Sequence, residues 1–138
     1  MYKYALLGYI VPKKILWRFN MSCKTIQCPV EATLNLIGGK YKALILWHLV
    51  DKTLRFGELR DFVACATPKM LTQQLRELEA DGFIHREVYP VVPPKVEYSL
   101  TEFGKSIVPI LNAMCNWGTE YLAKSSITNK CEKETPPL

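Results

Sequence analysis

A change of hydrophobic period at Gly82 most constrains how this chain can fold. Before it, Leu71, Leu75 and Leu78 recur at the three- and four-residue spacing of a helix with one buried face. After it, the segments FIHREVYP and KVEYSLT alternate apolar and polar residues, as half-buried strands do. The sequence therefore predicts a helix that is followed directly by a β-hairpin.

The predicted helix has its own start and stop signals. Thr67 followed by Pro68 suits an N-cap and a first helical residue, and Gly82 after Asp81 suits a C-terminal stop. The face opposite the leucines carries the cationic or hydrogen-bonding residues Lys69, Thr72, Gln73 and Arg76. Such a face is either an ordinary solvated surface or one that contacts a polar, anionic partner, and this segment alone leaves both readings open.

Three further helical segments precede this unit. Pro29 opens a helix that Gly38 and Gly39 end, and a second helix begins at Lys40. The second helix is apolar nearly all round and is predicted to be central and largely buried, through Leu44, Leu46, Trp47 and Val50. LRF, residues 54–56, suits a minimal strand, and GELRDFVACA suits a third helix that places Leu59, Phe62 and Val63 inward.

A long last helix is predicted to begin at Thr101 and Glu102, and Pro109 should kink or divide it. Two prolines, Pro93 and Pro94, stiffen the tip of the hairpin without extending its ladder. The element order then matches a mainly α fold with a small β-hairpin, which is a winged helix-turn-helix with terminal dimerisation helices. DFVACATPKMLTQQL supplies the helix-turn-helix pair and the proline-tipped hairpin supplies the wing.

The positive charge is concentrated at one end of the chain. The chain has 18 basic and 13 acidic residues, which gives a formal net charge of +5. Residues 1–24 contain five of the basic residues and no acid, so the rest of the chain has 13 basic and 13 acidic residues. We expect residues 1–24 to be a basic, apolar extension, with Met21 as an alternative start, residues 25–124 to form the winged domain, and residues 125–138 to be a polar, disordered tail. Any nucleic-acid site must therefore depend on where charges lie in the domain.

Other functional classes find little support. No metal site is expected, because the five cysteines lack CxxC pairs or a nearby histidine pattern. No catalytic constellation or cofactor motif stands out, so an enzyme is not expected. No segment has the ~20 uncharged apolar residues of a membrane span, and we expect a cytoplasmic protein with no membrane partner.

The chain resembles the HxlR-type, MarR-like winged helix-turn-helix transcriptional regulators of bacteria. The matching pieces are CPVEATLNLIGGKYKALILWHL, LRFGELR, KMLTQQLRELEADGFIHREVY, PPKVEYSLTEFGKSIVPIL and the segment around Trp117. The chain departs from the usual pattern at Tyr41, where the family has Trp, and at Ala66–Thr67, where it has Ile before Ser or Pro. The second change touches the entry to the recognition helix.

The resemblance implies a homodimer that binds double-stranded operator DNA. The polar face around Arg76 and Gln73 then becomes a base-reading surface, in which arginine suits guanine and glutamine suits adenine. Candidate phosphate contacts are Lys40, Lys42, Arg55, Arg86 and Lys95. The predicted dimer surface, joined by the first helix, is the apolar stripe of the last helix: Ile107, Ile110, Leu111, Met114, Trp117, Tyr121 and Leu122.

Cys28 is a candidate redox sensor. It stands before Pro29 at a predicted helix N-terminus, where amide groups and the helix dipole favour a thiolate. Several relatives in the resembling family use the cysteine of CPVE in this way, and Cys115 and Cys65 are the available disulfide partners. The alternatives are an uninvolved thiol in a regulator with a small-molecule inducer, or a winged-helix module that binds proteins.

Overall fold

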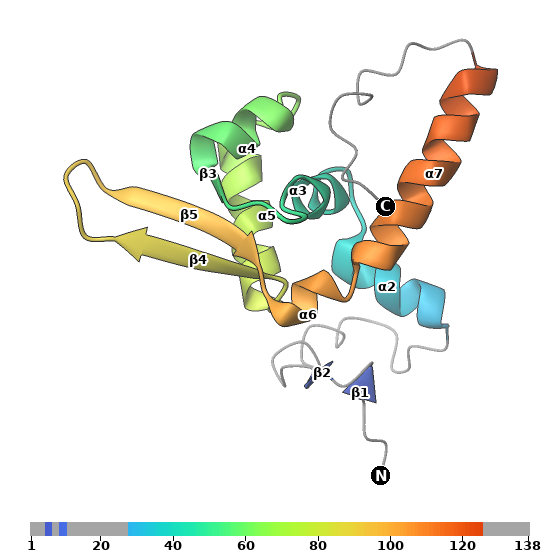
Figure 1. Cartoon of the computed structure of the whole chain (residues 1–138), viewed down its shortest axis with the longest axis horizontal. Helices are drawn as coiled ribbons and strands as arrows, with labels where there is room; N and C mark the ends of the chain where they lie inside the picture. Colours follow the sequence, from blue (N-terminus) through green and yellow to red (C-terminus); the bar gives the residue numbers. More distant parts are fainter. Residues whose placement is uncertain (1–4, 7–8, 11–27, 126–138) are drawn as a thin grey trace.

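The computed structural model describes residues 5–6, 9–10 and 28–125 (Figure 1). Most of the predicted extension and nearly all of the predicted tail lie outside the described residues, and so do Cys23 and Cys131. The elements are β1 Ala5–Leu6, β2 Tyr9–Ile10, α2 Pro29–Ile37, α3 Lys42–His48, β3 Leu54–Arg55, α4 Phe56–Phe62, α5 Pro68–Ala80, β4 Ile84–Tyr89, β5 Lys95–Leu100, α6 Glu102–Lys105 and α7 Val108–Lys124.

The predicted hairpin is confirmed, and it gains a third strand. β4 pairs with β5 in an antiparallel register from Ile84↔Leu100 to Tyr89↔Lys95. The two-residue β3 adds to the other edge of β5 through Leu54↔Tyr98, which gives the strand order β3-β5-β4. The hairpin projects to the side of the molecule opposite α7 (Figure 1). It therefore has the position of a wing beside the helix-turn-helix pair α4–α5.

The core forms where α3 meets α4, α5 and α7. The three leucines predicted to be inward on α5, Leu71, Leu75 and Leu78, are all buried, as are Ile45 and Leu46 on α3. Two predictions about the core were wrong: Leu44 of α3 is 44% exposed, and Phe62 of α4 is 38% exposed. A small domain does not have enough elements to surround its central helix, so one side of α3 remains open to solvent.

Local capping residues set the ends of the helices as expected. The Thr67 hydroxyl accepts a hydrogen bond from the Met70 amide at 3.2 Å, and Gly82 ends α5 with a left-handed φ of 82°. Thr101 caps α6 by accepting from the Gly104 amide at 2.9 Å. The last helix divides into α6 and α7, with Pro109 in the first turn of α7, as the position of that proline predicted.

Gly104 lets α6 pack directly on the end of α5. A Cβ atom at this buried position would overlap the carbonyl oxygen of Phe83. The Thr101 hydroxyl also donates to the carbonyl oxygen of Gly82 at 2.5 Å. These contacts fix the start of α6 against the turn between α5 and β4, and thereby fix how α7 leaves the winged domain.

Candidate nucleic-acid interface

The polar face of α5 is open to solvent. Lys69, Gln73 and Arg76 are exposed and Thr72 is half-buried, while the leucines on the opposite face are buried in the core. The Thr67 cap and Pro68 leave the first turn of this 13-residue helix facing outward. The face is therefore available to a partner without any rearrangement of the core.

The side chains on this face differ in how far they are already engaged. Arg76 makes no hydrogen bond or ion pair with another described residue, so all its donors are available. The Thr72 hydroxyl donates to the Pro68 carbonyl oxygen at 2.8 Å. Gln73 donates from Nε2 to Oε1 of Glu77 at 3.3 Å. Arg76 and Lys69 are thus both unengaged by other described residues, whereas Gln73 is held on one side.

Lys42 was predicted to contact phosphate, but its side chain is buried. Its side chain is 8% exposed, and its Nζ lies 2.8 Å from Oε2 of Glu77 on α5. The sequence prediction for Lys42 was wrong because the start of α3 packs against α5, which turns the lysine inward. The sequence analysis also did not predict the contact between Glu77 and Gln73, although residues four apart on a helix are neighbours.

Three of the other predicted cations remain exposed. Lys40 lies two residues before α3, which starts at Lys42 and not at Lys40 as predicted, and its Nζ is 5.4 Å from the centroid of the Tyr41 ring. Arg55 follows Leu54 in β3, and Arg86 lies on β4 opposite Tyr98. These positions are spread over the segment before α3, strand β3 and strand β4 of the wing.

Lys95 is held within the wing. Its Nζ lies 2.8 Å from Oε1 of Glu97 and 4.8 Å from the centroid of the Tyr89 ring. The hydrogen bond from Lys95 lowers the pKa of Glu97, and the hydrogen bond to Glu97 raises the pKa of Tyr89. Part of the charge of Lys95 is therefore offset by Glu97. Beyond this pair the wing tip is apolar, with Val92 99% exposed.

The predicted dimer stripe divides into two groups. Ile107 and Leu111 are buried in the core of the domain, so those two predictions were wrong, because α6 and the first turns of α7 pack on the winged domain. Leu122 is half-buried. The remaining residues form one exposed apolar stripe along α7, which we call the α7 stripe: Ile110, Met114, Trp117 and Tyr121.

Helix α7, which carries the α7 stripe, extends well beyond the part of it that packs on the domain (Figure 1). Its most exposed side chain is Trp117, at 69%, whose ring stacks on Tyr121 with 5.4 Å between centroids. Val30 and Leu34, four residues apart on α2, are also more than half exposed. A monomeric domain rarely exposes aromatic and aliphatic side chains in such a row.

The three described cysteines occupy different environments. Cys28 is exposed at the N-cap position of α2, where its side chain makes no capping hydrogen bond. Cys65 is exposed before α5, and its carbonyl oxygen accepts a hydrogen bond from the Tyr41 hydroxyl at 3.0 Å. Cys115 lies half-buried on α7. Among the described residues, no group of three or more histidine, cysteine or acidic side chains is placed to hold a metal ion.

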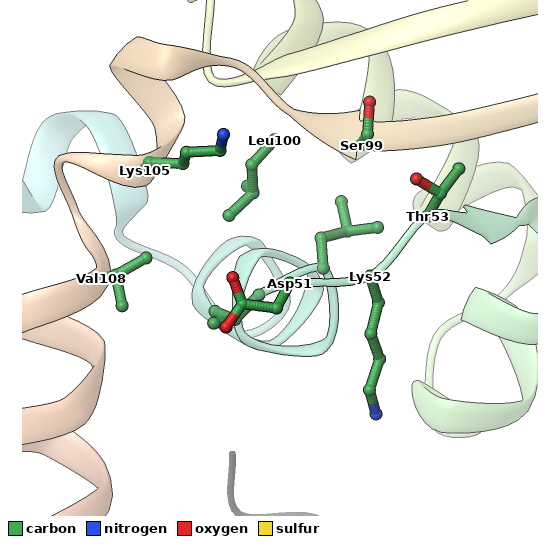
Figure 2. Close-up of a pocket in the computed structure, with 9 residues that line it drawn as sticks. Asp51, Lys52, Thr53, Ser99, Leu100, Lys105 and Val108 are labelled. Carbon is green, nitrogen blue, oxygen red and sulfur yellow. The ribbon is translucent and has the colours of Figure 1, made fainter. Parts of the chain in front are cut away.

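An open pocket of about 470 Å³ lies where the end of α3, the end of β5 and the start of α7 meet (Figure 2). Its polar lining residues are Asp51, Lys52, Thr53, Ser99 and Lys105. The ammonium groups of Lys52 and Lys105 point in different directions (Figure 2), and Lys105 is paired with Glu102 at 2.8 Å. The pocket therefore has polar walls but no converging charges.

Together these features define the class of protein. A helix-turn-helix whose second helix exposes a polar, cationic face, beside a three-stranded sheet with a projecting hairpin, is a winged helix-turn-helix of the kind that binds DNA. No helix in the described part of the chain has both the length and the apolar character to cross a membrane.

Comparison with known proteins gives the family. A model of the HxlR-like helix-turn-helix family matches residues 36–126, so the chain belongs to the HxlR family of DNA-binding transcriptional regulators. It is 58% identical over 94 residues to the HTH-type transcriptional regulator YdeP of Bacillus subtilis, which is 68% of this chain and 73% of YdeP. The family consists of regulators of transcription and not of enzymes.

Two solved structures are informative relatives. The redox regulator HypR in its oxidised form has 57% identity and a TM-score of 0.65, over 67% of this chain and 96% of that chain. The reduced form of the transcriptional regulator YodB from B. subtilis has 31% identity and a TM-score of 0.59, over 80% of this chain and all of that chain. The predicted family and fold are therefore confirmed.

Proposed function

We propose that this regulator binds a specific operator as a homodimer, with α5 of each protomer in the major groove. The observation that carries the proposal is the exposed face of α5, where Arg76 and Gln73 extend away from a fully buried row of leucines. A helix of this kind fits the ~12 Å major groove of B-DNA. Arginine forms paired hydrogen bonds with guanine, and glutamine forms them with adenine.

The exposed cations around α5 support contacts to phosphate. Lys69 lies in the first turn of α5, where the helix N-terminus itself favours an anion. Lys40, Arg55 and Arg86 are exposed on neighbouring elements. Such contacts fix the register of the protein on DNA and carry no base information.

The α7 stripe is the proposed dimer surface, with Val30 and Leu34 of α2 as further contacts. In a twofold dimer the same patch is used by both protomers, and the two copies of α5 would lie about 34 Å apart to enter successive turns of the major groove. The operator should then be an inverted repeat with that half-site spacing.

Selection of genomic DNA fragments by the purified protein tests this function. We expect enrichment of a short inverted repeat, and footprinting should show protection of two half-sites. Fragments enriched without a shared sequence would instead indicate a winged-helix module that does not discriminate between bases. This result would favour the alternative, in which the module serves to bind proteins.

We further propose that a thiol at Cys28 controls DNA binding. HypR, a relative at 57% identity, is a redox regulator, and Cys28 is an exposed thiol at the N-cap position of α2. Oxidation to a disulfide with Cys115 or Cys65 of the second protomer would change the separation of the two α5 helices. Cys115 is the better placed partner, because it lies on the helix that carries the α7 stripe.

Thiol labelling followed by mass spectrometry, beside operator binding, tests this control. Cys28 should label fastest of the cysteines, and diamide should change the operator affinity of the wild type but not of Cys28→Ser. Cys115→Ser and Cys65→Ser then identify the disulfide partner on non-reducing gels. Slow labelling of Cys28, or an oxidant response that survives Cys28→Ser, would favour a small-molecule inducer, for which the pocket beside Lys105 is a candidate site.

A further inference from the structure

A short chain of contacts links a buried lysine to the base-reading face of α5. The Nζ atom of Lys42 lies 2.8 Å from Oε2 of Glu77, and Nε2 of Gln73 donates to Oε1 of the same carboxylate at 3.3 Å. The side chain of Lys42 is 8% exposed and that of Glu77 is 23% exposed, whereas Gln73 is exposed. The contacts therefore run from the interior of the domain to its proposed DNA surface.

The carboxylate of Glu77 determines which way the amide of Gln73 can face. A carboxylate only accepts hydrogen bonds, so the NH₂ end of the amide must point toward it and the carbonyl end must point away. One N–H of Gln73 is used by Glu77, which leaves the second N–H and the carbonyl oxygen for a partner. Adenine requires this combination, because its N7 accepts a hydrogen bond and its N6 donates one.

Lys42 gives the carboxylate a fixed position. An exposed pair of residues on one helix contributes little order by itself, because long side chains sample several rotamers. A buried ammonium differs, because it cannot be left without a partner in the interior. Glu77 is consequently held on its Lys42 side, and its charge is offset, so that it repels the phosphates of DNA less.

We propose that Lys42 and Glu77 are positioning residues that orient the Gln73 amide so that α5 prefers adenine at one operator position. This inference rests on the proposed placement of α5 in the major groove. It assigns Lys42 a part in base discrimination, although Lys42 itself does not reach the DNA.

The test uses the full-length protein and the operator that the wild type selects. Base preference is measured by competition among four operators that differ only at the position where Gln73→Ala abolishes discrimination. The variants are Glu77→Gln and the double variant Lys42→Met/Glu77→Gln, which removes both charges and leaves no unpaired ion in the interior. Thermal unfolding of each variant confirms that it is folded.

We expect both variants to lose adenine preference by roughly five- to tenfold, within the range for one bidentate base contact. Discrimination at the position read by Arg76 should stay unchanged in the same DNA. Glu77→Gln combined with Gln73→Ala should show the same base preference as Gln73→Ala alone, because Glu77 acts only through Gln73. The matched control is Glu79→Gln, an equal change of charge at an exposed position of α5, which should keep the wild-type preference.

Each outcome is decisive. Retained adenine preference in the folded double variant would overturn the inference, and so would an equal loss of preference at the position of Arg76, which would indicate a shift of the whole helix. Failure of the wild type to select any operator would instead refute the proposed function, and the two failures are thereby distinguished.

Discussion

Replacement of Trp117 by alanine should dissociate the proposed dimer while leaving the protomer folded. The side chain of Trp117 is 69% exposed on α7, and its ring stacks on that of Tyr121 in the same stripe. An aromatic side chain buries about 150–250 Å² when it is fully enclosed, so roughly 100–170 Å² of each Trp117 remains to be covered by a partner. Because little of the ring is buried in the protomer, its loss should scarcely change the free energy of unfolding of the protomer.

The expected effect on the dimer is large because the substitution acts twice. At about 25 cal/mol per Å², two copies of Trp117 contribute at most roughly 5–8 kcal/mol to association. Alanine keeps part of the apolar surface and the partner side chains relax, so we expect a net loss of about 3 kcal/mol. This loss corresponds to an increase of roughly 150-fold in the dimer dissociation constant.

Sedimentation equilibrium over a wide range of protein concentration measures this constant. The matched control is Phe62→Ala, which removes another exposed aromatic ring, on α4 and away from the α7 stripe. A dissociation constant that is unchanged for Trp117→Ala, or that rises equally for Phe62→Ala, would refute the assignment of the dimer surface. Operator affinity should fall together with dimer stability, because each half-site alone binds weakly.

Three further predictions concern the DNA face, the core and the wing. Arg76→Ala should reduce discrimination at one base position by about 1–3 kcal/mol, whereas Lys40→Ala should weaken binding to all sequences and lower the salt slope by about 1, as measured by fluorescence anisotropy. Gly104→Ala should lower stability by about 1–3 kcal/mol in thermal unfolding, because the added methyl group has no space. Lys95 holds the pKa of Glu97 below the ordinary 4.5, so their ion pair stabilises the wing at neutral pH. Protonation of Glu97 on acidification removes this stabilisation. NMR titration should show a low midpoint for Glu97, and Lys95→Ala should raise that midpoint.

Much of the fold could be predicted from local sequence. The change of period at Gly82, the caps at Thr67 and Thr101 and the break at Pro109 all act over a few residues, so their consequences do not depend on distant contacts. The family motifs added the order of the elements and the function of the class. The exposed face of α5 followed from the leucine spacing alone, because a single buried row fixes the opposite side of a helix.

What the sequence could not supply was the identity of the neighbour that covers each remaining face. A lysine at the start of a helix is normally solvated, but Lys42 is buried because α3 packs on α5 and brings it to Glu77. Likewise, spacing placed Ile107 and Leu111 on the same stripe as Trp117, yet the packing of α7 on the winged domain buries the first two and leaves the third exposed. Helical period determines which residues share a face, whereas burial depends on which element lies against that face, and only the tertiary structure decides this.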